Sequence, residues 1–158
     1  MYIPYPKNIS KKELQHSSTA LSLGIQNSVP AEYEINLVQL AWFLQKVRDE
    51  LKAQFGKELP IIITSGFKSP ELNSVIHGSR TSAHLRGHAA DIKVPGLSTV
   101  ELARFIDDHL TGFDQVIEEF GRWVHVGLSD HPRGQVLKAT KGYARTEYTP
   151  LDEPEVFR

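Results

Sequence analysis

The stretch SAHLRGHAAD, residues Ser82–Asp91, places two histidines, a glycine and a carboxylate within ten positions. It runs from a segment without hydrophobic periodicity into the alternating stretch ADIKV at residues 90–94, and so predicts a loop that enters a strand. Neutral imidazole and carboxylate groups are good zinc ligands. His84 and Asp91 are therefore candidate metal ligands, and His88 is an alternative to His84.

A third ligand has to come from elsewhere in the chain, and His125 in the stretch WVHVGL is the best candidate. Successive side chains of a strand point to opposite faces, so His125 shares a face with Trp123, while Val124 and Val126 share the other. The valines predict the core face, and we therefore expect His125 to face a cleft. Three protein ligands and one open position are the arrangement of a catalytic zinc site.

Two adjacent glutamates precede this histidine, and they face opposite sides of the expected strand. A hairpin that turns in two residues at Gly121 and Arg122 would place Glu118 on the face of His125. A three-residue turn or a bulge would bring Glu119 there instead. The hairpin pattern alone leaves both glutamates open as the general base.

The remaining patterns predict an α+β fold. We expect helices at residues 9–15, 31–55, 69–78 and 98–110, strands at 58–67, 90–94 and 134–140, a hairpin at 115–128 and a loop at 19–32. Because a tight hairpin joins some of the strands, we expect a small central, largely antiparallel sheet flanked by helices. The length suits a single domain of residues 1–158, with a core at about 9–140 and a polar C-terminal tail at 141–158.

Composition excludes several classes of protein. A net charge of −1 lacks the basic excess of a dedicated nucleic-acid binder, and no apolar run approaches the roughly 20 residues of a membrane helix. The absence of cysteine removes disulfides and thiolate ligands, so a tight metal site must use His, Asp or Glu. Residues 1–17 lack the apolar core of a signal peptide. We therefore expect a soluble monomer made in the cytoplasm, with no nucleic-acid partner and no membrane insertion.

The stretch SAHLRGHAAD matches the motif Ser-x-His-x-x-Gly-x-Ala-x-Asp at every fixed position. This motif resembles that of the zinc D-Ala-D-Ala carboxypeptidase and L-Ala-D-Glu endopeptidase family of murein peptidases, which shares its fold with the hedgehog signalling domain. The stretches SGFKSPELN, DQVIEEFGRWVHVGL and ELQHSSTALSLGI also resemble segments of this family, the last one in its phage and bacterial branch. Together they cover about residues 9–140 in the family's order.

The resemblance implies a role for each candidate residue of the metal site. Zn²⁺ would be held by His84, Asp91 and His125. The catalytic base would be Glu119, six residues before the last ligand, with Glu118 as the alternative.

The same resemblance implies substrate contacts at Lys68, Ser82 and Trp123. Lys68 stands where the family usually has arginine, so it keeps the charge but loses the bidentate fork. Ser82 could equally cap the backbone of its own loop. Trp123 stands where some relatives have a histidine. It cannot polarise an oxyanion as an imidazole would, and we expect it to form a wall of the cleft.

The expected function is hydrolysis of a peptide bond in the peptidoglycan stem peptide, either as a D-Ala-D-Ala carboxypeptidase or as an L-Ala-D-Glu endopeptidase. A chain of 158 residues leaves no room for a separate wall-binding domain. The resemblance therefore suggests a phage endolysin that reaches the cell wall in the periplasm through a holin. The alternative is a non-catalytic zinc-binding module, such as a phage structural domain, although a retained Glu119 argues against it. A nuclease is disfavoured because the chain has no carboxylate cluster suited to magnesium.

Overall fold

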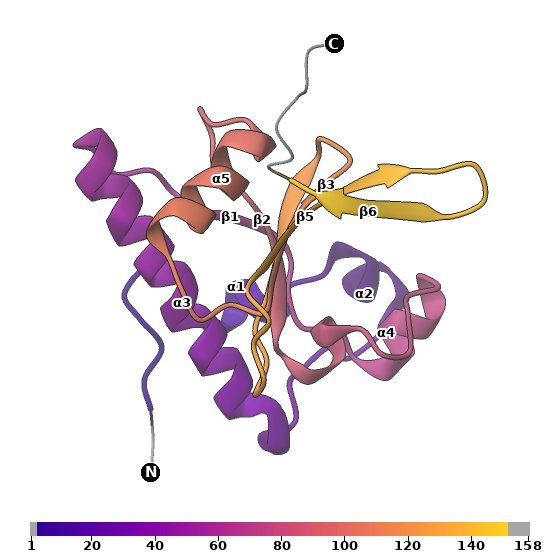
Figure 1. The fold of residues 1–158 in the computed structure, drawn as a ribbon. Helices are drawn as coiled ribbons and strands as arrows, with labels where there is room; N and C mark the ends of the chain where they lie inside the picture. Colours follow the sequence, from indigo (N-terminus) through magenta and orange to yellow (C-terminus); the bar gives the residue numbers. More distant parts are fainter. Residues whose placement is uncertain (1–2, 152–158) are drawn as a thin grey trace.

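The fold is described by a computed structural model, which covers residues 3–151 (Figure 1). Its helices are α1 (Lys11–Gln15), α2 (Ser18–Leu23), α3 (Ala31–Phe55), α4 (Pro70–Val75), the 3₁₀ helix η1 (Ala83–Arg86) and α5 (Thr99–His109). Its strands are β1 (Ile62–Ser65), β2 (Ala89–Lys93), β3 (Gln115–Glu119), β4 (Trp123–Gly127), β5 (Gln135–Lys141) and β6 (Thr146–Pro150). The predicted α+β class is confirmed.

The strands form one six-stranded sheet in the order β1-β2-β4-β3-β5-β6. The prediction of a largely antiparallel sheet is wrong, because β5 pairs with β3 in parallel and the sheet is mixed. The hairpin β3–β4 has only one free edge, since β2 already pairs with the other side of β4. The chain therefore crosses from β4 to the far side of β3, and this crossover gives β5 the direction of β3.

Serine caps define most of the helix starts. The side chains of Ser10, Ser69 and Ser98 each accept a hydrogen bond from a backbone N–H in the first turn of α1, α4 and α5. The loop predicted at residues 19–32 is wrong in its first part, which belongs to α2. Ser17 caps that helix, and Gly24 ends it with a φ of 67°.

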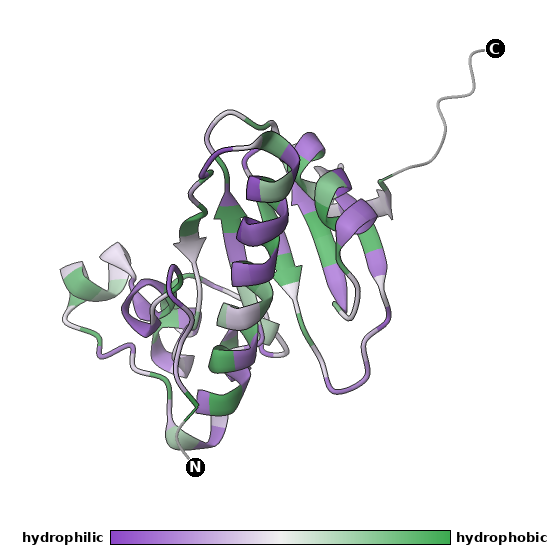
Figure 2. Ribbon diagram, turned by 90° about the vertical axis from the view of Figure 1, so that its left-hand side faces the viewer, coloured by the Kyte–Doolittle hydropathy of each residue, from purple (hydrophilic) through white to green (hydrophobic). Residues whose placement is uncertain are grey.

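The hydrophobic core lies between one face of the sheet and the helices α3 and α5. Val116 of β3 and Val124 of β4 belong to the same buried cluster as Leu44 of α3 and Ile106 of α5. Figure 2 shows α3 lying across the sheet, with many hydrophilic residues on its outer side. Because side chains alternate along a strand, this core leaves the opposite face of the sheet free to carry a site.

The C-terminal part of the described chain forms a hairpin rather than a loose segment. Residues 146–150, which fall in the predicted polar tail, form β6 and pair with β5. The last part of that predicted tail, residues 152–158, lies outside the described residues. Within residues 3–151, no helix combines the length and the apolar character that a membrane crossing requires.

Candidate metal centre

Three elements bring the predicted ligands together on the free face of the sheet. Asp91 on β2 lies directly opposite His125 on β4 in the antiparallel register. The 3₁₀ helix η1, immediately before β2, carries His84. The ligand atoms of these three residues all lie within 4.8 Å of one another. The sequence prediction of these residues as neighbours therefore agrees with the structure.

The distances among these side chains fit a single metal ion. Asp91 Oδ1 lies 3.0 Å from His125 Nδ1 and 3.4 Å from His84 Nε2. Ligand bonds of about 2.0–2.1 Å in tetrahedral geometry would separate neighbouring ligand atoms by about 3.3 Å. Two imidazoles and one carboxylate are also a common donor set for zinc, so the residues present fit this metal.

A backbone carbonyl orients the first ligand. His84 Nδ1 lies 2.8 Å from the carbonyl oxygen of Gly66, and a hydrogen bond donated by Nδ1 to this oxygen leaves Nε2 free to bind a metal. Gly66 packs so closely against the backbone of Leu14 in α1 that a Cβ atom would overlap the Leu14 carbonyl oxygen. The N-terminal helix thus fixes the loop that holds His84.

Asp91 is held in its ionised form. Burial alone would raise the pKa of this carboxyl, but the hydrogen bonds from His125 and His84 outweigh burial and hold the pKa well below its usual range. A carboxylate that stays ionised at neutral pH is the form that binds a metal.

His88, the alternative to His84, lies elsewhere. It is buried next to a cavity lined by Trp42 and Phe43 of α3, away from the three-residue cluster. Burial lowers the pKa of His88, with a further lowering from Arg86. The geometry therefore favours His84 over His88 as the ligand.

The hairpin turn places Glu119 on the face of His125. Glu119 pairs with Trp123, and Ile117 pairs with His125, so three residues rather than two form the turn. The turn is possible because Phe120 and Gly121 adopt positive φ angles of 59° and 70°. Of the two arrangements that the sequence left open, the structure has the one that brings Glu119 to the cluster.

The Glu119 carboxylate lies beside the ligands without being one of the three closest groups. Its Oε1 is 3.8 Å from His125 Nδ1 and accepts a hydrogen bond of 3.2 Å from Trp123 Nε1. Burial raises the pKa of Glu119, and the nearby charge of His125 only partly opposes this effect. A carboxylate with a raised pKa beside a set of metal-binding side chains is suited to accept and release a proton.

Glu118 points to the opposite side of the sheet. Its side chain is 1% exposed and accepts hydrogen bonds from Thr99 Oγ1 at 2.7 Å and from the Gly121 backbone N–H at 2.8 Å. These contacts tie the hairpin to the start of α5. Glu118 therefore has a structural environment, separated from the metal cluster by the sheet itself.

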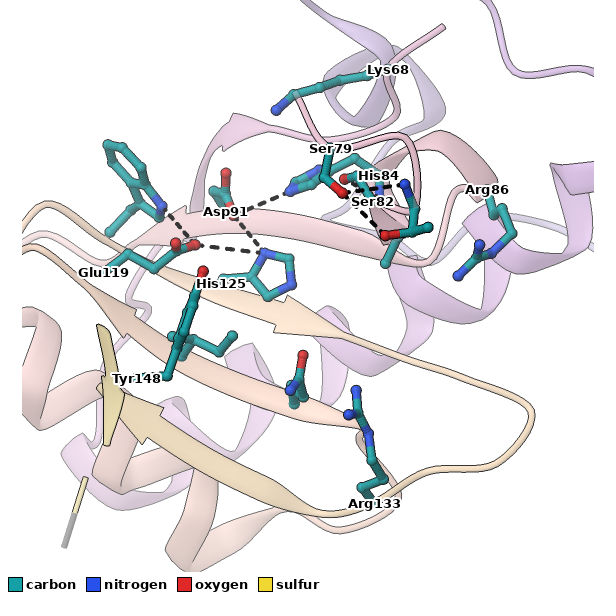
Figure 3. A pocket seen from close by; sticks show the side chains of 15 residues that line it. Lys68, Ser79, Ser82, His84, Arg86, Asp91, Glu119, His125, Arg133 and Tyr148 are labelled. Atoms are coloured by element: carbon teal, nitrogen blue, oxygen red, sulfur yellow. Dashed lines mark hydrogen bonds and ion pairs between the residues drawn. The ribbon is translucent and has the colours of Figure 1, made fainter. Parts of the chain in front are cut away.

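A cavity of about 540 Å³ opens over the cluster, and all three predicted substrate residues line it (Figure 3). Lys68 follows β1, and Trp123 lies at the start of β4 beside Glu119. Ser82 Oγ also accepts a hydrogen bond of 3.3 Å from the backbone N–H of His84. Ser82 thus combines a place in the cavity wall with the capping role that its loop position suggested.

Sequence reasoning missed several residues of the cavity wall. These are Ser79, Thr81, Arg86, Gln115, Arg133 and Tyr148. Tyr148 comes from β6, which lay in the predicted polar tail. The residues on the same strand face as Tyr148, Thr146 and Pro150, form no hydrophobic pattern that would predict a strand. Only the pairing of β6 with β5 shows that Tyr148 lies in the cavity wall.

Comparison with known proteins agrees with this geometry. A family model for peptidase M15 matches residues 7–127, and the chain belongs to that family. The chain is also 29% identical over 112 residues, 71% of its length, to a protein named zinc D-Ala-D-Ala carboxypeptidase from Streptomyces albus G. It spans about 40% of the length of this relative. The predicted family is thus confirmed, and the β5–β6 hairpin lies outside the matched range.

Proposed function

We propose that this M15 family member is a zinc-dependent peptidase that hydrolyses a peptide bond in the stem peptide of peptidoglycan. One observation carries the proposal: Glu119 lies on the same sheet face as the His84–Asp91–His125 cluster, with its Oε1 3.8 Å from His125 Nδ1. A purely structural metal site has no use for a partly buried carboxylate beside its ligands. A hydrolytic site needs such a group as a general base.

His84, Asp91 and His125 would hold the zinc ion in this proposal. Zinc supplies a Lewis acid that lowers the pKa of water and polarises a carbonyl group. Glu119 would take a proton from the attacking water at Oε1 and pass it to the leaving amine. The hydrogen bond from Trp123 Nε1 keeps the Glu119 carboxylate turned toward the cluster during this transfer.

The cavity suits a short peptide with free carboxylates. Lys68 and Arg86 contribute positive charge to its wall, and Ser82 contributes a hydroxyl group. The stem peptide of peptidoglycan carries such carboxylates. We propose that Lys68 pairs with one of them and that Trp123 walls the cleft. The bond would be either the D-Ala-D-Ala bond or the L-Ala-D-Glu bond, and the relative named as a D-Ala-D-Ala carboxypeptidase supports the first.

The cellular role proposed is that of an endolysin that acts as a monomer on the cell wall, in the periplasm, after release through a holin. The support for this role is the match to a peptidase family.

The experiment is digestion of purified peptidoglycan by zinc-loaded protein, with the released amino groups counted and the products identified by mass. Wild type is compared with Glu119→Ala and with Glu118→Ala. We expect wild type and the folded fraction of Glu118→Ala to cut, and Glu119→Ala to bind zinc without cutting. Zinc binding with no cleavage by wild type would replace this function with that of a zinc-binding module.

A further inference from the structure

The hairpin β5–β6 extends the sheet beyond β3 and carries one aromatic side chain into the cavity. Glu119 on β3 pairs with Ala139 on β5, and Ala139 pairs with Tyr148 on β6. Residues paired in this way across neighbouring strands share a face of the sheet. Tyr148 therefore lies on the face of the metal cluster, two strands away from Glu119, and it lines the same cavity.

The residue between them is small enough to let the tyrosine reach the cluster. Neighbouring strands are about 4.8 Å apart, so the backbones of Glu119 and Tyr148 are separated by about 10 Å. Ala139 is fully buried and offers only a methyl group to the space between. Figure 3 shows the Tyr148 ring crossing this space, with its hydroxyl pointing toward His125 and Glu119.

The tyrosine hydroxyl brings a hydrogen-bond donor to the β5–β6 side of the cavity, beside His125 and Glu119. The indole N–H of Trp123 is turned toward Glu119 Oε1, and Gln115 donates to Gln135. Lys68 lies on the other side of the cluster from Tyr148 (Figure 3). Burial raises the pKa of Tyr148, and the charge of Glu119 raises it further, so the phenol keeps its proton at neutral pH.

We propose that Tyr148 is a catalytic residue that donates a hydrogen bond to the scissile carbonyl oxygen as negative charge develops there. This inference rests on the proposed peptidase function. The water oxygen bonds to the carbonyl carbon, and the carbonyl electron pair moves to its oxygen, where the Tyr148 O–H group donates without losing its proton. Glu119 accepts a proton from the water and gives it to the leaving nitrogen as the carbon–nitrogen bond breaks.

The test compares Tyr148→Phe with Tyr143→Phe in the zinc-loaded full chain. Tyr143 is a matched control, because it lies in the turn of the same hairpin, is fully exposed and does not line the cavity. The Tyr148→Phe substitution keeps the ring over Ala139 and removes only the hydroxyl. We expect a loss of about 10²–10³-fold in kcat with little change in KM, as found for single oxyanion donors, and no loss for Tyr143→Phe.

A second readout does not depend on turnover. Phosphinate analogues of the D-Ala-D-Ala and L-Ala-D-Glu dipeptides carry a tetrahedral oxyanion, and their affinity is measured by calorimetry for both variants and wild type. We expect the analogue that wild type binds to lose at least 10-fold in affinity in Tyr148→Phe alone, because a donor aimed at a charged oxygen contributes more than a neutral hydrogen bond.

The outcomes separate the two proposals. If wild type cuts peptidoglycan and Tyr148→Phe matches it in kcat and in analogue affinity, the Tyr148 role is overturned and the peptidase function stands. If no wall preparation is cut but Tyr148→Phe still weakens analogue binding, the Tyr148 contact stands and the peptidoglycan substrate is wrong. If wild type neither cuts nor binds an analogue, both are rejected.

Discussion

The two adjacent glutamates of β3 provide a sharp prediction, because they face opposite sides of the sheet. Replacing Glu118 by alanine removes the acceptor of two short hydrogen bonds, from Thr99 Oγ1 and from the backbone N–H of Gly121. A hydrogen bond contributes about 0.5–1.5 kcal/mol to stability, and a donor left buried and unpaired adds a penalty of about 1–3 kcal/mol. We expect the free energy of unfolding to fall by about 3 kcal/mol in Glu118→Ala.

The assay is urea unfolding of the metal-free protein together with cleavage by the zinc-loaded protein. For a chain of this size, 3 kcal/mol corresponds to a fall of roughly 6–12 °C in Tm. Glu118→Gln is the matched control, since its amide oxygen can still accept from both donors, and we expect it to lose about 1 kcal/mol. At a temperature where Glu118→Ala is folded, its kcat should be within about threefold of wild type. Wild-type stability in Glu118→Ala, or loss of activity in the folded variant, would refute the assignment of Glu118 to the structure and Glu119 to the chemistry.

Three further predictions concern the metal centre. Burial raises the pKa of Glu119, so its ionised carboxylate destabilises the metal-free fold once the pH rises above the ordinary pKa of glutamate. Glu119→Gln should therefore have a higher Tm than wild type at pH 7 but not at pH 3. An equal difference in Tm at both pH values would contradict this prediction. Gly66→Ala should lower the free energy of unfolding by about 2 kcal/mol or more and weaken zinc binding, because a Cβ atom would displace the backbone carbonyl that orients His84. Urea unfolding measures the first effect and calorimetric zinc titration the second. An unchanged affinity for zinc would be evidence against the carbonyl contact. Zinc at about 1,000 times its dissociation constant should stabilise wild type by about 4 kcal/mol and Asp91→Asn much less. The rise in Tm on addition of zinc measures both effects. An equal rise in Tm in wild type and in Asp91→Asn would place the ion elsewhere.

Local patterns were sufficient to predict most elements of the fold. The long helix α3 follows from its apolar periodicity and from the glycine that ends it, Gly56, which has a φ of 70°. The capping box of α5, formed by Ser98 and Glu101, is as visible in the sequence as in the structure. Helix α2 carries comparable signals, with Ser17 at its start and Gly24 at its end, but the breaks in its hydrophobic pattern concealed them.

Long-range pairing was not encoded in the same local way. The parallel pairing of β5 with β3 depends on which edge of the sheet is free, and no residue of β5 indicates which edge that is. The place of Tyr148 in the cavity depends on the register of three strands. The turn between β3 and β4 required Phe120 to adopt a positive φ, which is uncommon for a bulky residue and could not be read from its type.

The residues of the candidate site also differ in how far the sequence alone could predict them. Spacing and strand alternation in the sequence indicated Asp91, His125 and either His84 or His88 as ligands. The resemblance to the peptidase family selected His84, which the structure places in the cluster. The hairpin pattern left both Glu118 and Glu119 open, and the family resemblance favoured Glu119. The observed register of β3 and β4 places Glu119 on the face of His125.

The central claim is that His84, Asp91 and His125 together hold one zinc ion with an open position. X-ray absorption at the zinc edge of the loaded protein tests it most directly, with His84→Ala measured beside wild type. We predict one zinc per chain, with two imidazole nitrogens and a carboxylate oxygen at about 2.0–2.2 Å together with a fourth, non-protein oxygen, and a large loss of affinity in the variant. A zinc shell without two imidazoles, or unchanged zinc binding in His84→Ala, would contradict the account.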